Sequence, residues 1–271
     1  MLKQFIKHEF KETARLLIPL NLILIALALF GAILFRIDLF SKYNLEIIAT
    51  SALILYILGI LVLFILTAVY LAMRFYKTMY SGQGYLTHTL PVSTTAILNT
   101  KIFVSVFWLC IAFLVTAGSA LLLIMSASGK SWDLSALSYI QEEFSRSMGF
   151  GFYEFLGIMA GLIVVFFFSS VLMVCASFSV GQLFRQNRLA ASIAAYIVFY
   201  IAQQIISMIL LVILSIGNSD MILQMQSNAA SADVANFYQW LFAIVLLQSV
   251  AFSVIYYIIS FYISNNKLNL E

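Results

Sequence analysis

Six long apolar runs divide this chain and constrain its fold more than any other feature. They cover residues 16–35, 47–73, 102–125, 155–184, 189–216 and 238–263. Because an α-helix rises about 1.5 Å per residue, about 20 apolar residues cross a hydrocarbon core of about 30 Å. Each run reaches or exceeds that length, and Lys, Arg, Asp and Glu are nearly absent from all six. The sequence therefore predicts an all-α membrane protein with six transmembrane helices.

The composition supports the same class. The chain has 271 residues, of which 63% are hydrophobic, and a mean hydropathy of +1.05. Outer-membrane barrels are excluded, because their strands alternate apolar and polar residues over about 10 positions and show no continuous apolar blocks. No segment between the runs exceeds about 30 residues, whereas independent domains have about 50 or more. A single transmembrane domain over residues 1–271 is expected.

The basic residues predict the orientation. Six spans place both termini on one side, and Lys and Arg favour the cytoplasmic side. The N-terminal side carries most of them: Lys3, Lys7, Lys11, Arg15, Arg74, Lys77, Lys101, Arg185, Arg188 and Lys267. The other side carries Arg36, Lys42, Lys130 and Arg146. We expect cytoplasmic termini in a bacterial cell membrane, and no nucleic-acid partner, because no soluble domain exists to form a groove for one.

Residues 1–15 show helical spacing of two kinds of side chain. An apolar row (Leu2, Ile6, Phe10 and Ala14) lies beside a basic row (Lys3, Lys7, Lys11 and Arg15). This pattern predicts an amphipathic elbow helix lying in the cytoplasmic interface. The alternative is a plain juxtamembrane anchor. On the other side, residues 126–154 and 217–237 are expected to form extracytoplasmic segments, the first containing a short helix.

Groups for catalysis are scarce. His8-Glu9 begins like the zinc-protease HExxH motif, but position 12 is Glu12, so the second histidine ligand is absent. The pair Glu142-Glu143 resembles the glutamates of intramembrane CAAX-type proteases, but it falls in an outer segment and no histidines follow within the spans. We therefore expect no metal site, and an intramembrane protease ranks last among the possible functions.

Energy from ATP would have to come from another chain. Residues 81–84 are glycine-rich but lack the Gly-Lys-Ser/Thr ending that a phosphate-binding loop needs. No ionisable residue lies clearly at the centre of any run, as pumps and proton-coupled carriers usually require. The chain itself is expected to be neither an enzyme nor the binder of a cofactor.

The cytoplasmic joint between the second and third runs, residues 74–101, carries the most information. Pro91 fixes φ near −65° and lacks an N–H, which suits the first turn of a helix. The sequence predicts a short helix from about Pro91 towards Lys101. It would present Val92, Ile97 and Leu98 beside several hydroxyl groups.

At this joint the chain resembles the type 2 ABC-transporter permease family. The family carries a glycine, then leucines and threonines, a Leu-Pro-Val-Ser step, an apolar pair and a lysine entering the third span. The matching residues are Gly84, Leu86, Leu90, Pro91, Val92, Ser93, Ile97, Leu98 and Lys101. The six-span plan and the basic, amphipathic N-terminus agree with it over the whole chain.

The resemblance implies a permease subunit of an ATP-driven exporter. The joint would then be a coupling helix bound by a separate nucleotide-binding ATPase subunit, which holds the ATP and Mg²⁺. A second permease subunit, identical or different, would complete the pathway for an amphipathic or hydrophobic substrate: a peptide, a drug or a lipid-like molecule. The alternative from another class is a membrane scaffold or sensor subunit that does not transport.

Polar residues inside two spans are candidates for a substrate cavity. Gln203 and Gln204 lie near the middle of the fifth run, where an amide needs partners on neighbouring helices or in a watery cavity. In the resembled family the second and fifth spans line the pathway, which adds Thr67 and Tyr70 of the second run. The alternative is hydrogen bonding between helices of one subunit.

Gly157 and Gly161 form a Gly-x-x-x-Gly spacing in the fourth run. Small residues at this spacing permit close approach of two membrane helices. We therefore expect a helix-packing role for this pair.

Overall fold

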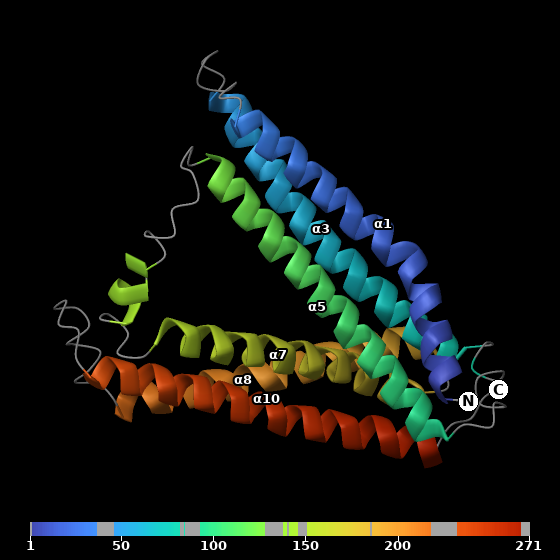
Figure 1. The fold of residues 1–271 in the computed structure, drawn as a ribbon. Helices are drawn as coiled ribbons and strands as arrows, with labels where there is room; N and C mark the ends of the chain where they lie inside the picture. The colour runs from blue at the N-terminus through green and yellow to red at the C-terminus, as the bar shows by residue number, and fades with distance from the viewer. Residues whose placement is uncertain are drawn as a thin grey trace. The chain divides into compact units, whose positions relative to one another are not determined.

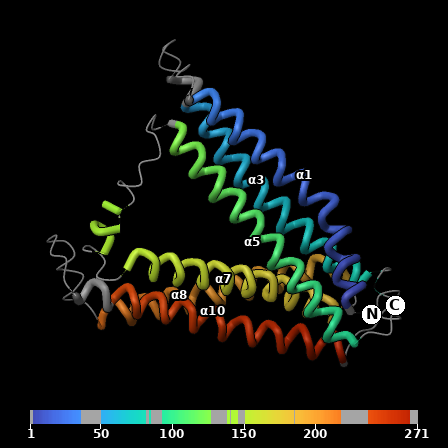
Figure 2. Tube along the Cα trace, viewed as in Figure 1, coloured from blue at the N-terminus to red at the C-terminus, as the bar shows by residue number. Residues whose placement is uncertain are grey.

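The computed structural model describes residues 2–36, 46–81, 84, 93–127, 138–139, 141–145, 151–184, 186–217 and 232–266, none of them in a strand. Six long helices follow one another along the chain (Figures 1 and 2): α1 (Leu2–Arg36), α3 (Glu46–Met79), α5 (Thr94–Ala127), α7 (Phe152–Gly181), α8 (Arg188–Gly217) and α10 (Ala232–Asn266). All six are long and apolar enough to cross a membrane. The prediction of an all-helical chain with six such helices is confirmed for the described residues.

The helices form two compact units, residues 1–133 and 134–269. In the first unit, α1 contacts both α3 and α5, and these two contact each other. In the second unit, α7, α8 and α10 contact one another in the same way. The single domain over residues 1–271 stays a prediction.

Two apolar clusters of the first unit lie along the middle and the C-terminal part of α1. Leu24, Leu63 and Ala112 meet there, one from each helix. Small residues follow, with Ala28 and Ala32 of α1 packed against Leu123 of α5. Small side chains allow close helix approach in the absence of a strong hydrophobic driving force within lipid.

The first helix is continuous from Leu2, and residues 2–15 are its first part and not a separate elbow helix. It runs from Leu2 to Arg36 with Pro19 inside it. One face is buried every four residues, at Glu9, Thr13, Leu17 and Asn21, which is the spacing of one helix face. Proline removes one backbone hydrogen bond, but this packed face extends to both sides of Pro19 and keeps the two halves in line.

The third membrane helix begins after the proline of the joint. Ser93 is not helical and precedes α5, which starts at Thr94. The Ser93 hydroxyl accepts a hydrogen bond from the Ala96 N–H at 3.4 Å, the position of a helix N-cap. The helix expected to run from Pro91 therefore starts about three residues later, and Pro91 itself lies outside the described residues.

The core of the second unit lies on α7. Leu172, Cys175 and Ala176 are buried there, and Tyr256 of α10 is buried too. In contrast, the only buried residue of α8 is Ser192. The outward apolar side chains of α8 suit contact with lipid or with another subunit.

A close backbone approach joins α7 to α8. A methyl group placed on Gly181 would lie 2.8 Å from the Cα of Ser192, so only glycine fits there. Asn187, just before α8, has φ 53°, a left-handed conformation that asparagine tolerates better than most residues.

The two expected extracytoplasmic segments are described in part. Within 126–154, residues 138–139 and 141–145 are helical. The Gln141 side-chain amide donates a hydrogen bond to the Tyr153 hydroxyl at 2.8 Å, connecting this short helix to the start of α7. Residues 218–231 of the second segment lie outside the described residues.

Candidate functional site

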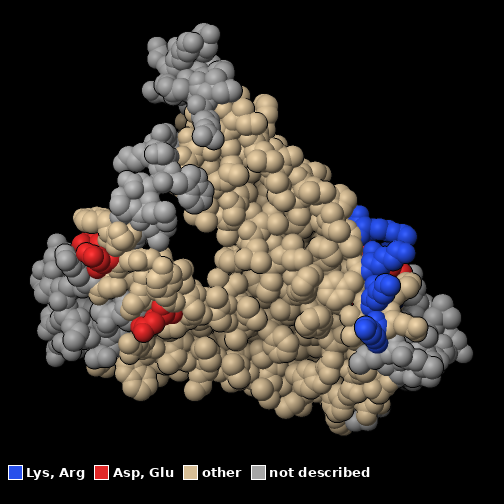
Figure 3. Space-filling view, in the orientation of Figure 1, with Lys and Arg blue, Asp and Glu red and all other residues tan. Residues whose placement is uncertain are grey.

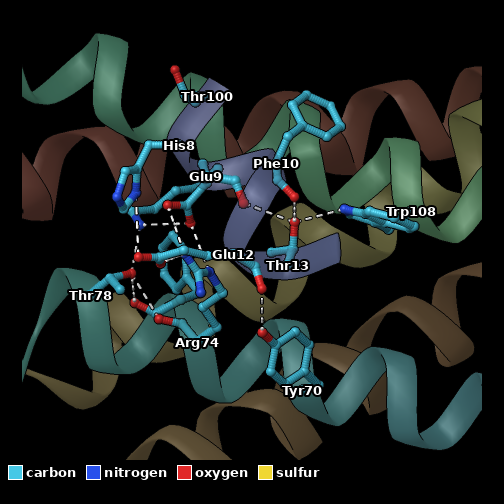
Figure 4. Close-up of polar contacts among 12 residues, drawn as sticks. His8, Glu9, Phe10, Glu12, Thr13, Tyr70, Arg74, Thr78, Thr100 and Trp108 are labelled. Carbon is cyan, nitrogen blue, oxygen red and sulfur yellow. Dashed lines mark hydrogen bonds and ion pairs between the residues drawn. The ribbon is translucent and has the colours of Figure 1, made fainter. Parts of the chain in front are cut away.

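A buried carboxylate on α1 binds two basic side chains from α3 and α5 (Figure 4). Arg74 of α3 donates from Nε to Glu9 Oε1 and from Nη2 to Glu9 Oε2, both at 3.0 Å. Lys101 of α5 donates from Nζ to Glu9 Oε1 at 3.3 Å. The Glu9 side chain is 9% exposed and that of Lys101 only 4%. We name the set of Glu9, Glu12, Arg74 and Lys101 the ionic cluster.

Glu12 completes the ionic cluster on its more exposed side. It pairs with Nη2 of Arg74, and its own side chain is 42% exposed. His8 lies one turn earlier on α1, with Nδ1 3.3 Å from Glu12 Oε1. Thr78 accepts a hydrogen bond from Lys101 Nζ at 2.6 Å. The buried ammonium therefore has both an ionic and a neutral partner.

A second layer of hydrogen bonds holds this end of α1 in place. Trp108 Nε1 of α5 donates to Thr13 Oγ1 at 2.8 Å, and Thr13 Oγ1 donates to the Glu9 carbonyl at 2.9 Å. Tyr70 of α3 donates from its hydroxyl to the Glu12 carbonyl at 3.5 Å. Figure 4 shows Trp108 and Tyr70 reaching this turn of α1 from two different helices.

The charges of the ionic cluster balance, two acidic against two basic. An isolated buried charge is costly, and removal of one partner from a buried pair leaves the other uncompensated. Glu9 is shared by both bases, so one carboxylate compensates Arg74 and Lys101 together. The ionic cluster therefore fixes the relative positions of α1, α3 and α5 at this end of the first unit.

A groove and a row of exposed basic side chains lie beside the ionic cluster. A groove of about 760 Å³ is lined by its four members together with His8 and Lys77, among others. The row predicted from the sequence, Lys3, Lys7, Lys11 and Arg15, is exposed. Figure 3 shows Lys and Arg gathered over the N-terminal end of α1. Such a surface suits anionic headgroups or an acidic partner.

The predicted coupling residues do not lie together on one surface in the part of the chain that the structure describes. Lys101 belongs to the ionic cluster, and Ser93 precedes α5. Ile97 and Leu98 are buried inside the first unit, so they are not presented to a partner as the sequence suggested. Gly84 is buried, and its N–H donates to the Ser81 carbonyl at 2.6 Å. The remaining positions lie outside the described residues: Leu86, Leu90, Pro91 and Val92.

The cavity candidates fall in both units. Thr67 is buried in the first unit, and its hydroxyl has no hydrogen-bond partner among the described residues. Tyr70 lines the groove beside the ionic cluster. Gln203 and Gln204 line a cavity of about 470 Å³ in the second unit, between α7, α8 and α10.

The predicted glycine pair makes no close contact within the described chain. A methyl group on Gly157 or on Gly161 would meet no described neighbour within 4 Å. The close approach to another helix backbone occurs at Gly181, outside this spacing, and a methyl group on Gly31 would lie 3.0 Å from the Leu123 side chain. No group of three His, Cys, Asp or Glu side chains in the described ranges could hold a metal ion.

Sequence reasoning missed Glu9 as a site residue. The apolar row at Leu2, Ile6 and Phe10 drew attention to a neighbouring face, whereas the buried face passes through Glu9 and Thr13. A signal was available in the sequence: Glu9, Thr13, Leu17 and Asn21 recur every four residues, which places them on one helix face.

Comparisons of this chain with protein-family models, curated proteins and solved structures find no match.

Proposed function

We propose that this chain is the membrane-spanning permease subunit of an ATP-driven ABC exporter. A separate nucleotide-binding subunit hydrolyses ATP, and the joint at 74–101 receives its movement. A second permease subunit completes the pathway, and the substrate is amphipathic or hydrophobic: a peptide, a drug or a lipid-like molecule. Both termini and the joint lie in the cytoplasm.

One observation carries the proposal: both ends of the joint are fastened to the same carboxylate. Arg74 stands at its beginning and Lys101 at its end, and both bind Glu9. A force on the joint therefore acts on α3 and α5 together and reaches α1 through Glu9. This geometry supports a coupling role, because a joint that merely connected two spans would not need both ends anchored to a third helix.

The lengths of the helices support transmission of the movement. Helices α3 and α5 have 34 residues each, or about 51 Å at 1.5 Å per residue. A hydrocarbon core is about 30 Å thick. Such helices extend beyond it, so a displacement at the joint can reach the other end of the first unit as a rigid-body movement.

Photochemical cross-linking tests the proposal. A photoreactive amino acid replaces Leu86 or Leu90 in the full chain, which is expressed in its source organism, and cross-linked proteins are identified by mass spectrometry. We expect a soluble protein that contains the Gly-x-x-x-x-Gly-Lys-Ser/Thr phosphate-binding loop. Position 139, exposed in the expected outer segment, is the matched control and should capture none of it. Failure to capture such an ATPase from either joint position, or equal capture from position 139, overturns the proposal.

A further inference from the structure

The second unit contains a cavity whose lining differs from that of an apolar pocket in the first unit. It measures about 470 Å³ and lies between α7, α8 and α10, within the range of about 300 to 1,000 Å³ usual for small-molecule sites. A pocket of about 210 Å³ in the first unit has Tyr56 as its one lining residue with a side-chain hydrogen-bonding group. The cavity of the second unit has three glutamines, four serines and two tyrosines along its wall. This cavity therefore combines an apolar wall with many neutral polar groups, unlike the pocket of about 210 Å³.

Part of the polar wall is held rigidly by internal hydrogen bonds. The Gln248 side-chain amide of α10 donates to Ser207 Oγ and to the Gln203 carbonyl, both of α8. Tyr256 of α10 donates from its hydroxyl to Gln203 Oε1 at 3.3 Å. These bonds fix Gln203 and Gln248 before any ligand arrives, and such preorganisation lowers the cost of binding.

Another part of the wall has polar side chains that can form hydrogen bonds with a ligand. Ser169 of α7 is 4% exposed, and its hydroxyl has no hydrogen-bond partner among the described residues. Gln204 also lines the cavity, and its side chain is exposed. In hydrocarbon an unpaired polar group is costly, because lipid tails offer no partner. A ligand with its own donors and acceptors would satisfy both groups.

The chemistry of the lining selects the class of ligand. None of its residues is acidic or basic, so nothing would compensate a charged headgroup away from water. Leucine, isoleucine and phenylalanine alternate with the polar groups, which favours an alkyl portion beside a hydrogen-bonding one. We propose that this cavity binds an uncharged amphiphile with a hydroxyl- or carbonyl-bearing head and a short alkyl chain, a chemistry that a monoacylglycerol represents.

The inference concerns binding alone, so it does not depend on an ATPase or on transport. The probe is a short-chain monoacylglycerol with a diazirine and an alkyne on its chain, added to the full-length protein in lipid nanodiscs. Mass spectrometry locates the labelled peptides. We expect saturable labelling of α8 and α10 that unlabelled monoacylglycerol removes and the fatty-acid anion of equal chain length does not.

Two variants test the lining directly. Gln204→Leu keeps the side-chain size but removes the amide, and Tyr200→Phe removes only a hydroxyl group from the wall. We expect each to reduce labelling at least fivefold. Ser215→Ala is the matched control, because Ser215 lies on the same helix, outside the lining, and it should leave labelling unchanged.

Three results would overturn the proposal. One is labelling that does not saturate, as for bulk lipid. Another is equal competition by the fatty-acid anion, which would show no preference for an uncharged head. The third is unchanged labelling in both lining variants, which would show that the polar groups of the wall do not hold the probe.

Discussion

The two three-helix units bury polar side chains in different ways. The first unit gathers ionised groups, Glu9 with Arg74 and Lys101, at the end of the bundle that carries the exposed basic row. The second unit places neutral groups, Gln203 and Gln248, near the midpoints of α8 and α10. The free-energy cost of a charged side chain is low near headgroups and water and high in the middle of the membrane. Neutral amides and hydroxyls are tolerated there when they form hydrogen bonds between helices.

The two units should differ in how strongly the substitution of one buried polar side chain destabilises them. Loss of one member of the ionic cluster leaves a buried charge without its partner. A single substitution there should therefore cause a large loss of stability. Loss of one amide from the neutral network leaves partners that can find other hydrogen bonds, so its failure should be gradual. Four predictions follow this contrast, from the largest expected effect to the smallest.

Glu9→Gln should give the largest loss of stability. It leaves both Arg74 and Lys101 without the carboxylate they share, and removal of one partner from a buried ion pair costs about 3 to 5 kcal/mol. The loss of stability is measured as the change in the free energy of unfolding in mixed micelles. Glu12→Gln is the matched control: because the Glu12 side chain is 42% exposed, its loss should cost at most about 1 kcal/mol. Equal effects of the two substitutions would refute the shared-carboxylate account.

Gly181→Ala should destabilise the second unit by steric means. The new methyl group would meet the backbone of Ser192, and overpacking of this kind costs about 1 to 3 kcal/mol. Thermal unfolding of the purified chain measures the loss. Gly157→Ala and Gly161→Ala place a methyl group in open space within a helix and should leave the unfolding temperature unchanged or raise it, because alanine favours the helix over glycine. A loss at all three glycines would point to backbone flexibility and away from the contact with Ser192.

Gln248→Leu should have a moderate effect. Hydrogen bonds between membrane helices contribute about 0.6 kcal/mol on average and at most about 1.7 kcal/mol, and this amide makes two of them to α8. A double-mutant cycle with Ser207→Ala measures the coupling between α8 and α10, which should be positive and below about 2 kcal/mol. A coupling as large as the Glu9 effect would remove the contrast between the two units.

Ser93→Ala should have the smallest effect. Loss of an N-cap costs about 0.5 to 2 kcal/mol, and the 3.4 Å distance from the Ala96 nitrogen to the Ser93 hydroxyl oxygen places this cap at the low end. Amide hydrogen exchange at the start of α5 should rise while the rest of the helix is unaffected. Faster exchange along the whole of α5 would show that the joint and the helix open together.

The sequence predicted the spans well because each apolar run is long enough to be interpreted without its neighbours. Gln203 and Gln204 are also conspicuous in the sequence, because they are amides inside such a run, and their role in a substrate cavity stays a prediction. Both residues line a cavity in the structure. These features depend on local composition, which a sequence displays directly.

The ionic cluster and the contact of Gly181 with Ser192 could not be predicted from local composition. Arg74 and Lys101 lie 65 and 92 positions from Glu9, and pairings over such distances depend on how the helices pack. Gly181 gives no spacing signal, since its partner Ser192 lies across a turn. The expected separate elbow helix rested on the apolar row at 2–14, whereas the face through Glu9 and Thr13 is the one that packs.

The most direct measurement of the coupling account is a distance change driven by ATP. Nitroxide labels at Leu121 on α5 and Ile213 on α8, both exposed, report movement between the two units in a chain whose native cysteines, Cys110 and Cys175, are replaced. Pulsed electron resonance compares the complex with its ATPase before and after trapping with ATP and vanadate. The account predicts a shifted distance distribution in the intact chain, and loss of that shift in Glu9→Gln while the ATPase stays bound. The same shift with and without Glu9 would contradict it.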